Sequence, residues 1–351
     1  MASQDYIDVY KGVVNHVQQL LEKNKEWRDR YAGYADALST KAKDIQAAAK
    51  KFHVPAPFHL YLSVSMAKKC TKDKAFFELR FHGRSVATLK VSLKDDEVQL
   101  AAKKPKAVCD ALRNLGMTEA AKHLEHCAAN KNISWKSEDA KLFRKIYADL
   151  ESKMASGEVS LPGQPEHDME SWLLQNYAQK SSVGKEILYV QPVTMADTDA
   201  KFQMPTPLRA SNAKDGTEQI TYAKQYGGGI DILARMGRGK QTTLAIMELK
   251  DENKKTEPPE KAIRQAIAYA TFIRALLRDK KCGPAWWHFF GFGGEIPEKL
   301  NLKAIIVMPN APNTATDFIG KPIQLRENGD QITLGYIYRE NGGLKQEIHI
   351  D

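Results

Sequence analysis

The chain has 351 residues, 42% hydrophobic and 27% charged, with a formal net charge of +9 at pH 7. This length exceeds the roughly 100–200 residues of a usual domain, so we expect two domains. No apolar run approaches the ~20 residues of a membrane span, and the N-terminus lacks a basic-then-hydrophobic leader, which indicates no membrane partner. Four widely spaced cysteines without a C-x-x-C pair favour a reducing cytoplasm over a disulfide framework or a zinc site.

The N-terminal part of the sequence predicts an α+β domain over residues 1–155. Two short predicted helices have helix-turn-helix spacing, with Thr118 as the N-cap of the second. This pair is either a DNA-binding helix-turn-helix or a helical hairpin that only packs in the core. The expected elements are one or two helices over 6–51, a strand over 59–66, a hairpin of 76–81 and 85–92, a strand over 97–101, helices over 108–115 and 119–129, and a linker over 152–165.

The positive charge is concentrated in the same part of the sequence. Residues 1–160 contain 28 Lys and Arg against 20 Asp and Glu, whereas residues 161–351 contain 24 against 23. Phosphate backbones attract basic surfaces without regard to base sequence. The N-terminal domain is therefore predicted to contact nucleic acid.

A second domain is expected over residues 156–351, beginning with an amphipathic helix over 166–179. A strand begins within 187–190, and two apolar, β-prone runs follow, at 229–233 and 244–250. Between them stands a turn-like Met-Gly-Arg-Gly-Lys sequence at 236–240. This pattern predicts a β-hairpin centred near Gly239.

The predicted hairpin brings charged residues together at the end of a hydrophobic sheet. With the turn near Gly239, Asp231 and Glu248 lie roughly opposite each other. Because residues two apart on a strand share a face, Glu248 and Lys250 point together while Leu249 points away. Residues 244–247 are apolar on both faces, as in a buried central strand, where charges need a partner or a metal ion. Carboxylate oxygens suit Mg²⁺, and a nearby lysine can orient or deprotonate a water, which outlines metal-assisted phosphodiester hydrolysis.

The residues after the hairpin predict a helix and further strands. Two prolines precede a helical pattern over 261–277, in which Gln265 and Tyr269 lie one turn apart on the same face. A strand is expected over 302–308 and a C-terminal hairpin over 332–339 and 344–350. The aromatic segment 286–292 is explained by burial against the sheet or by a base-stacking surface.

Asp231 followed by Glu248-Leu249-Lys250 resembles the signature of the PD-(D/E)XK nuclease superfamily, an acid, a variable gap and then Glu-x-Lys. The Gln265-x-x-x-Tyr269 helix resembles one large branch of that superfamily. The order of expected elements over residues 165–310 is similar to its core, although Ile230 stands where the motif's name has proline. The resemblance implies an α/β domain with a restriction-endonuclease-like mixed sheet flanked by helices.

The resemblance also implies roles for individual residues. Asp231, Glu248 and the backbone carbonyl of Leu249 would hold Mg²⁺ or Mn²⁺, and Lys250 would position or activate the attacking water. Gln265 and Tyr269 would position the substrate or the Lys250 amine. A glutamate on the first helix would face the metal site, and Glu170 is assigned to it, with Glu166 one turn earlier as the alternative.

The sequence thus predicts a Mg²⁺-dependent endonuclease that acts on DNA. A homodimer is possible, since two active sites would allow both strands to be cleaved. The alternatives are an RNA-directed or structure-specific nuclease of the same fold, and a non-catalytic nucleic-acid-binding protein. The intact Asp231, Glu248 and Lys250 argue against a decayed site.

Overall fold

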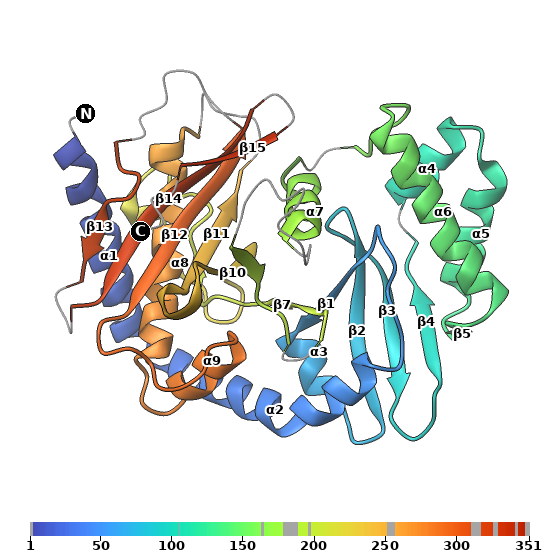
Figure 1. The fold of residues 1–351 in the computed structure, drawn as a ribbon, viewed down its shortest axis with the longest axis horizontal. Coiled ribbons are helices and arrows are strands. Elements are labelled where there is room, and N and C mark those ends of the chain that lie inside the picture. The colour runs from blue at the N-terminus through green and yellow to red at the C-terminus, as the bar shows by residue number, and fades with distance from the viewer. Residues whose placement is uncertain are drawn as a thin grey trace. The chain divides into compact units, whose positions relative to one another are not determined.

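The computed structural model describes residues 3–104, 106–162, 165–177, 189–195, 198–250, 257–309, 317–325, 329–340 and 343–347 (Figure 1). The chain forms two compact units, each built from separate stretches of sequence. The mixed-sheet unit contains Met1–Asp36, Trp172–Val193 and Gln203–Asp351, and the antiparallel-sheet unit contains Ala37–Ser171 and Thr194–Phe202.

This division differs from the boundary predicted near residue 155. Residues 1–36 belong with the C-terminal part of the chain, and the expected linker over 152–165 does not separate the units. The reason is packing over long sequence separations. The Tyr10 hydroxyl donates to the Glu260 carbonyl at 2.9 Å, and the Trp286 indole donates to the Tyr31 carbonyl at 3.2 Å.

The mixed-sheet unit is organised around one seven-stranded sheet. Its strand order is β13-β14-β12-β11-β10-β6, with β15 paired to β14. Strands β11, β12 and β14 run parallel, and the other pairs are antiparallel. The strands are β6 (Val190–Pro192), β10 (Ile232–Met236), β11 (Thr243–Leu249), β12 (Asn301–Pro309), β13 (Pro322–Gln324), β14 (Gln331–Glu340) and β15 (Gly343–Glu347), with a separate pair β8 (Leu208–Arg209) and β9 (Thr221–Tyr222).

Helices cover both faces of this sheet. Helix α8 (Pro259–Leu277) begins at the predicted prolines and packs on β11, β12 and helix α1 (Ser3–Lys23) (Figure 1). On the other face, the Tyr177 hydroxyl of helix α7 (Pro165–Tyr177) reaches the Met247 sulfur at 4.0 Å. An α/β architecture with a mixed sheet flanked by helices is thus confirmed. The remaining helices of this unit are α9 (Gly283–Phe289) and the 3₁₀ turns η1 (Thr217–Gln219) and η2 (Gly239–Gln241).

Two helices belong to both units. Helix α2 (Glu26–Ala49) passes from one unit to the other between residues 36 and 37, and α7 does so between 171 and 172. The predicted helical region 6–51 is therefore confirmed as helix, but it contributes to two cores.

The antiparallel-sheet unit matches most of the expected elements. Two details differ: Ser63 ends β1 because its hydroxyl accepts from the Met66 amide at 3.2 Å and starts a helix, and Met117, rather than Thr118, is the N-cap of α5, without a side-chain hydrogen bond. The sheet order is β5-β4-β3-β2-β1-β7. The elements are β1 (His59–Ser63), α3 (Val64–Lys69), β2 (Lys74–Phe81), β3 (Arg84–Ser92), β4 (Val98–Ala102), α4 (Lys106–Asn114), α5 (Thr118–Ala129), β5 (Ile133–Ser134), α6 (Glu138–Ala155) and β7 (Lys201–Gln203).

Charge does not distinguish the two units. The antiparallel-sheet unit contains 24 Lys and Arg against 19 Asp and Glu, and the mixed-sheet unit contains 28 against 24. The basic surplus of residues 1–160 therefore does not mark one unit as the nucleic-acid contact. Across the described ranges, none of the helices has the length and apolar character needed to cross a membrane.

The aromatic segment 286–292 is partly buried: three of its seven residues are buried, two are half-buried and two are exposed. The side chains of Trp286 and Phe290 are fully buried, and Trp287 is 6% exposed. Trp286 packs against Tyr31 and Phe289. These three buried side chains belong to the core of the mixed-sheet unit, which agrees with the burial interpretation for them alone.

Candidate active site

The β10–β11 hairpin has the predicted register. Ile232 pairs with Met247 and Met236 pairs with Thr243, so the centre of the turn lies between residues 239 and 240. The turn needs glycine at Gly237, where φ is +114° and a Cβ atom would stand 2.6 Å from the Gln241 carbonyl oxygen. Continuing this register by one residue places Asp231 opposite Glu248. Residues directly opposite in an antiparallel pair share a face of the sheet.

Asp231 is held at the end of the hairpin by the neighbouring strand. One of its carboxylate oxygens, Oδ2, accepts from the Leu249 amide at 2.9 Å, while the side chain remains exposed. The glycines that precede Asp231 allow the backbone to pass close to residues 206–208. A Cβ atom on Gly227 would stand 2.2 Å from the Thr206 carbonyl oxygen, and the Thr206 amide donates to the Gly228 carbonyl at 3.0 Å.

Glu248 is almost fully buried, with 1% of its surface exposed. Its Oε2 accepts from the Gln265 side-chain amide at 2.7 Å. Its Oε1 is also buried but has no hydrogen-bond partner among the described residues. Burial, and then the nearby Asp231 carboxylate, raise the pKa of Glu248 well above its ordinary value, and the Lys250 ammonium only partly opposes this. Among the described residues, the Lys250 charge therefore does not offset the combined effect of burial and of the second acid on Glu248.

Gln265 and Tyr269 share the face of α8 that meets this acid pair. Tyr269 is 2% exposed, and burial followed by the Glu248 and Asp231 charges raises its pKa. Hydrogen bonds with the Gln265 side chain and the Ala210 backbone act in the opposite direction. The predicted one-turn spacing is confirmed. The Gln265 side-chain amide donates to Glu248, although Gln265 was expected to position the substrate or the Lys250 amine.

Lys250 follows Glu248 at the end of β11 and is 8% exposed. Its backbone amide donates to the Val307 carbonyl at 2.9 Å, which continues the pairing with β12. Its Nζ lies 4.0 Å from Oε1 of Glu257, and Lys214 Nζ lies 3.8 Å from Oε2 of the same residue. Sequence reasoning missed Glu257 and Lys214, since neither belongs to the motif. The charge of Glu257, close to the Pro258-Pro259 start of α8, was the available signal.

Glu170 has its own set of contacts. The Tyr61 hydroxyl donates to its Oε1 at 2.5 Å, and Nδ1 of His167 lies 3.3 Å from its Oε2. Tyr61, His167, Glu170 and the alternative Glu166 all belong to the antiparallel-sheet unit. The assignment of Glu170 or Glu166 to the metal site therefore remains a prediction, and the contacts described for Glu170 are internal to its own unit.

The donor set at the hairpin end suits a hard cation. Over the described ranges, no group of three or more His, Cys, Asp and Glu side chains is placed to hold a metal ion. Mg²⁺ needs fewer protein side chains than this, because it is commonly bound through one or two carboxylates, with water and substrate phosphate completing its coordination shell. Asp231, Glu248 with its unpartnered Oε1, and the Leu249 carbonyl fit that requirement.

Comparison of the chain with protein-family models, with curated proteins and with solved structures found no match.

Proposed function

We propose that the protein is a Mg²⁺-dependent endonuclease that hydrolyses phosphodiester bonds of DNA. The observation that carries this proposal is the Asp231–Glu248 acid pair at the end of the hairpin, with Lys250 two residues further along. One of these acids is buried, and one of its oxygens has no hydrogen-bond partner in the part of the chain that the structure describes. Buried charges need a compensating partner, and a divalent cation would supply it.

Asp231, Glu248 and the Leu249 carbonyl would hold the ion. When bound, a divalent ion polarises a phosphoryl oxygen and lowers the pKa of a water to produce a nucleophile. The hydrogen bond from the Leu249 amide fixes the Asp231 carboxylate before any ion arrives, and Gln265 does the same for Glu248. Such preorganisation keeps the ligands from rearranging during the reaction.

Lys250 would place its ammonium beside the phosphate under attack. By strand alternation it shares the face of Glu248, and it is largely screened from water. A positive charge there stabilises the extra negative charge of the pentacovalent phosphorane more than that of the ground-state phosphodiester. The ion pairs of Glu257 with Lys250 and Lys214 restrain the lysine side chain.

The order of elements supports the same assignment. Helix α7, strands β6, β10 and β11, helix α8 and strand β12 occur in this order along the chain, with short strands inserted between β6 and β10 and α9 between α8 and β12, and β12 is parallel to β11. This is the element order that the resemblance to PD-(D/E)XK nucleases predicts. Functions differ widely within a fold, so the argument depends on the site residues.

The direct test is incubation of the full chain with supercoiled DNA, linear DNA, single-stranded DNA and RNA, each with Mg²⁺, with Mn²⁺ or with EDTA. We expect cleavage of DNA within the chain, giving nicked or linear products from the supercoiled substrate. Cleavage of RNA alone would transfer the same chemistry to another substrate. No cleavage of any substrate at millimolar metal concentrations would reject the proposal.

A further inference from the structure

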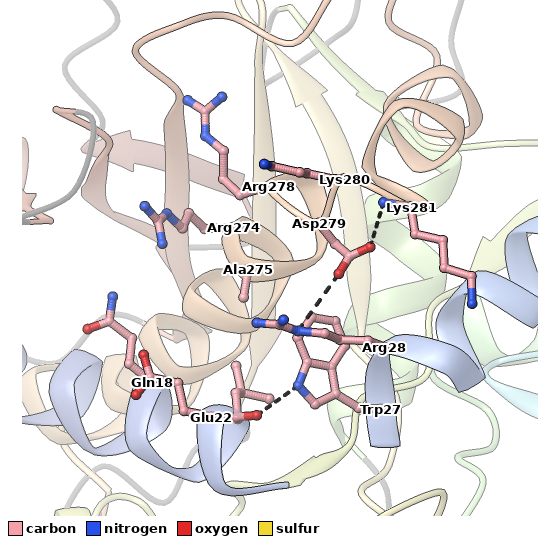
Figure 2. A pocket seen from close by; sticks show the side chains of 11 residues that line it. Gln18, Glu22, Trp27, Arg28, Arg274, Ala275, Arg278, Asp279, Lys280 and Lys281 are labelled. Carbon is pink, nitrogen blue, oxygen red and sulfur yellow. Dashed lines mark hydrogen bonds and ion pairs between the residues drawn. The ribbon is translucent and has the colours of Figure 1, made fainter. Parts of the chain in front are cut away.

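An exposed tyrosine stands a few residues before Asp231 in the sequence. Among the described residues, Tyr226 is the most exposed of the large hydrophobic side chains, at 71%. By contrast, Trp27 in the wall of a cavity formed by α1, α2 and α8 is 1% exposed and donates its indole N–H to the Leu21 carbonyl at 3.0 Å (Figure 2). Single exposed aromatic side chains are common on protein surfaces, so the surroundings of Tyr226 decide whether it has a role.

The backbone on both sides of Tyr226 is held in place. Its amide donates to the Ala223 carbonyl at 2.9 Å, which closes a tight turn. Immediately after it, the Gly228 carbonyl accepts from the Thr206 amide at 3.0 Å, and a side chain at Gly227 would collide with the Thr206 carbonyl. The ring of Tyr226 is therefore presented to solvent by a fixed backbone.

The side chains and conformation of this turn point to a contact surface. Lys224 has a φ of +55°, in the left-handed region that residues other than glycine rarely adopt. Such conformations are concentrated at functional sites. The Gln225 side-chain amide donates to the Tyr226 hydroxyl at 2.8 Å. Lys224 is exposed and forms no ion pair in the part of the chain that the structure describes. The turn thus carries a planar ring and an ammonium group close together.

This turn lies within reach of the acid pair. Five residues of extended chain span at most about 18 Å, which limits the separation of the Tyr226 and Asp231 Cα atoms. The segment 204–210, against which the turn packs, also contacts the site, because the Ala210 backbone hydrogen-bonds with the Tyr269 side chain. A nucleic-acid strand rises about 3.4 Å per nucleotide, so a strand with one phosphate at the acid pair would have its neighbouring nucleotides within reach of Tyr226.

We propose that Tyr226 stacks on an unpaired base of the nucleic acid and that Lys224 contacts the adjoining phosphate backbone. This role rests on the proposed function, and it makes the substrate a strand with unpaired bases close to the cleaved bond. An aromatic ring can stack on any base, typically gaining about tenfold or more in affinity, whereas a base inside a duplex is already stacked on its neighbours. Residues 205–229 contain three Lys and Arg against two Asp and Glu, so stacking, and not general attraction, provides the selectivity.

Fluorescence anisotropy of the full chain in EDTA tests this role, with a labelled oligothymidylate and a labelled duplex of the same length. Tyr226→Ala should weaken binding to the single strand about tenfold and binding to the duplex less than about twofold. Tyr226→Phe should keep the wild-type affinity, because the ring remains. Lys224→Ala should weaken both ligands by a similar factor, since phosphates are common to both. Tyr189→Ala, at a 36% exposed tyrosine opposite Gly237 at the other end of the hairpin, is the matched control and should change nothing.

The outcomes separate this role from the nuclease activity. An unchanged single-strand affinity in Tyr226→Ala, equal losses for single strand and duplex, or an equal loss in Tyr189→Ala would overturn the stacking role. So would the absence of binding at about 10⁻⁴ M protein, the weak end of non-specific affinities. Because EDTA prevents metal-dependent cleavage, such a failure would leave the nuclease proposal standing. Conversely, Tyr226-dependent binding without cleavage of any substrate in Mg²⁺ or Mn²⁺ would reject the nuclease and retain the stacking role.

Discussion

Glu248 in β11 and Asp330 directly before β14 are two buried carboxylates with opposite surroundings. Asp330 accepts hydrogen bonds from two arginines and a backbone amide, and its pKa is lowered. Glu248 accepts from the Gln265 side-chain amide, its Oε1 has no hydrogen-bond partner among the described residues, and burial and the nearby Asp231 carboxylate raise its pKa. Their burial is nearly equal, at 0% and 1% exposed. Burial raises the pKa of both carboxyls, and the difference is that hydrogen bonds from Arg278, Leu300 and Arg274 outweigh it at Asp330.

The negative charge of Asp330 is compensated by its hydrogen-bond donors, whereas the surroundings of Glu248 disfavour its negative charge. Removing a charge that is already compensated leaves other buried charges unpaired, which costs stability. Removing a charge that lacks compensation relieves the folded state. Strongly perturbed acids with an incomplete set of partners are concentrated at functional sites.

The first prediction concerns the divalent ion that we propose for the Asp231–Glu248 pair. We expect nuclease activity to be lost entirely in excess EDTA and restored by Mg²⁺ or Mn²⁺, but not by Ca²⁺, whose looser coordination positions water poorly. Time courses on supercoiled DNA measure this. Undiminished cleavage in EDTA would remove the metal mechanism and with it the interpretation of the acid pair.

The second prediction separates catalysis from metal binding. Lys250→Ala should lower the cleavage rate by about 10³-fold, the scale of losing one electrostatic transition-state contact, with metal affinity nearly unchanged. Asp231→Ala should lose metal affinity as well as activity. Lys240→Ala, an exposed lysine at the other end of the hairpin, is the control. Full activity in Lys250→Ala would contradict the Glu-x-Lys assignment.

The third prediction compares the two carboxylates in stability. Asp330→Asn should lower the free energy of unfolding by about 3–5 kcal/mol, because two guanidinium groups lose their shared anion. Glu248→Gln should leave it unchanged within about 0.5 kcal/mol or raise it, since the introduced amide oxygen can still accept from Gln265. Urea unfolding of both variants in EDTA gives these values. Equal losses would show that Glu248 is as well compensated as Asp330.

The fourth prediction is a smaller effect of pH on stability in EDTA. The folded-state pKa of Glu248 lies above its ordinary value of 4.5, so its contribution is fully present below pH 4.5 and is lost as the pH rises through the folded pKa. Asp330 behaves oppositely, since its folded pKa lies below 3.8 and its contribution is lost only as the pH falls through that value. Glu248→Gln should flatten the decline above pH 4.5, as melting temperatures across the pH range will show. An identical decline in wild type and Glu248→Gln would argue against a raised Glu248 pKa.

Local patterns predicted much of the fold and the arrangement of the candidate site. The glycine-containing turn and the apolar runs on either side are adjacent in sequence, so the hairpin and its register follow from short-range rules. The same holds for α8, with prolines at its start and Gln265 one turn from Tyr269. The β1 strand was predicted three residues too long, because the capping hydrogen bond of Ser63 competes with a continuing alternating pattern.

Long-range packing was not predictable in this way. No motif links Asp330 to Arg274 or Arg278, which are 56 and 52 residues away. The packing of residues 1–36 in the mixed-sheet unit was not predicted, because the sequence of an amphipathic helix does not indicate which sheet or helix it will pack against. A truncation at residue 155 would therefore remove α1 and uncover its packing surface on α8.

The pairing of α1 with α8 also bears on how the chain folds during its synthesis. Tyr10 and its partner Glu260 are separated by 250 residues. At the usual elongation rate of about 5–20 residues per second, α1 leaves the ribosome roughly 12–50 s before α8 can cover it. The antiparallel-sheet unit ends at Phe202, so its whole sequence emerges within that interval. We therefore expect the antiparallel-sheet unit to fold before the mixed-sheet unit is complete, while α1 keeps its apolar face uncovered and available to chaperones.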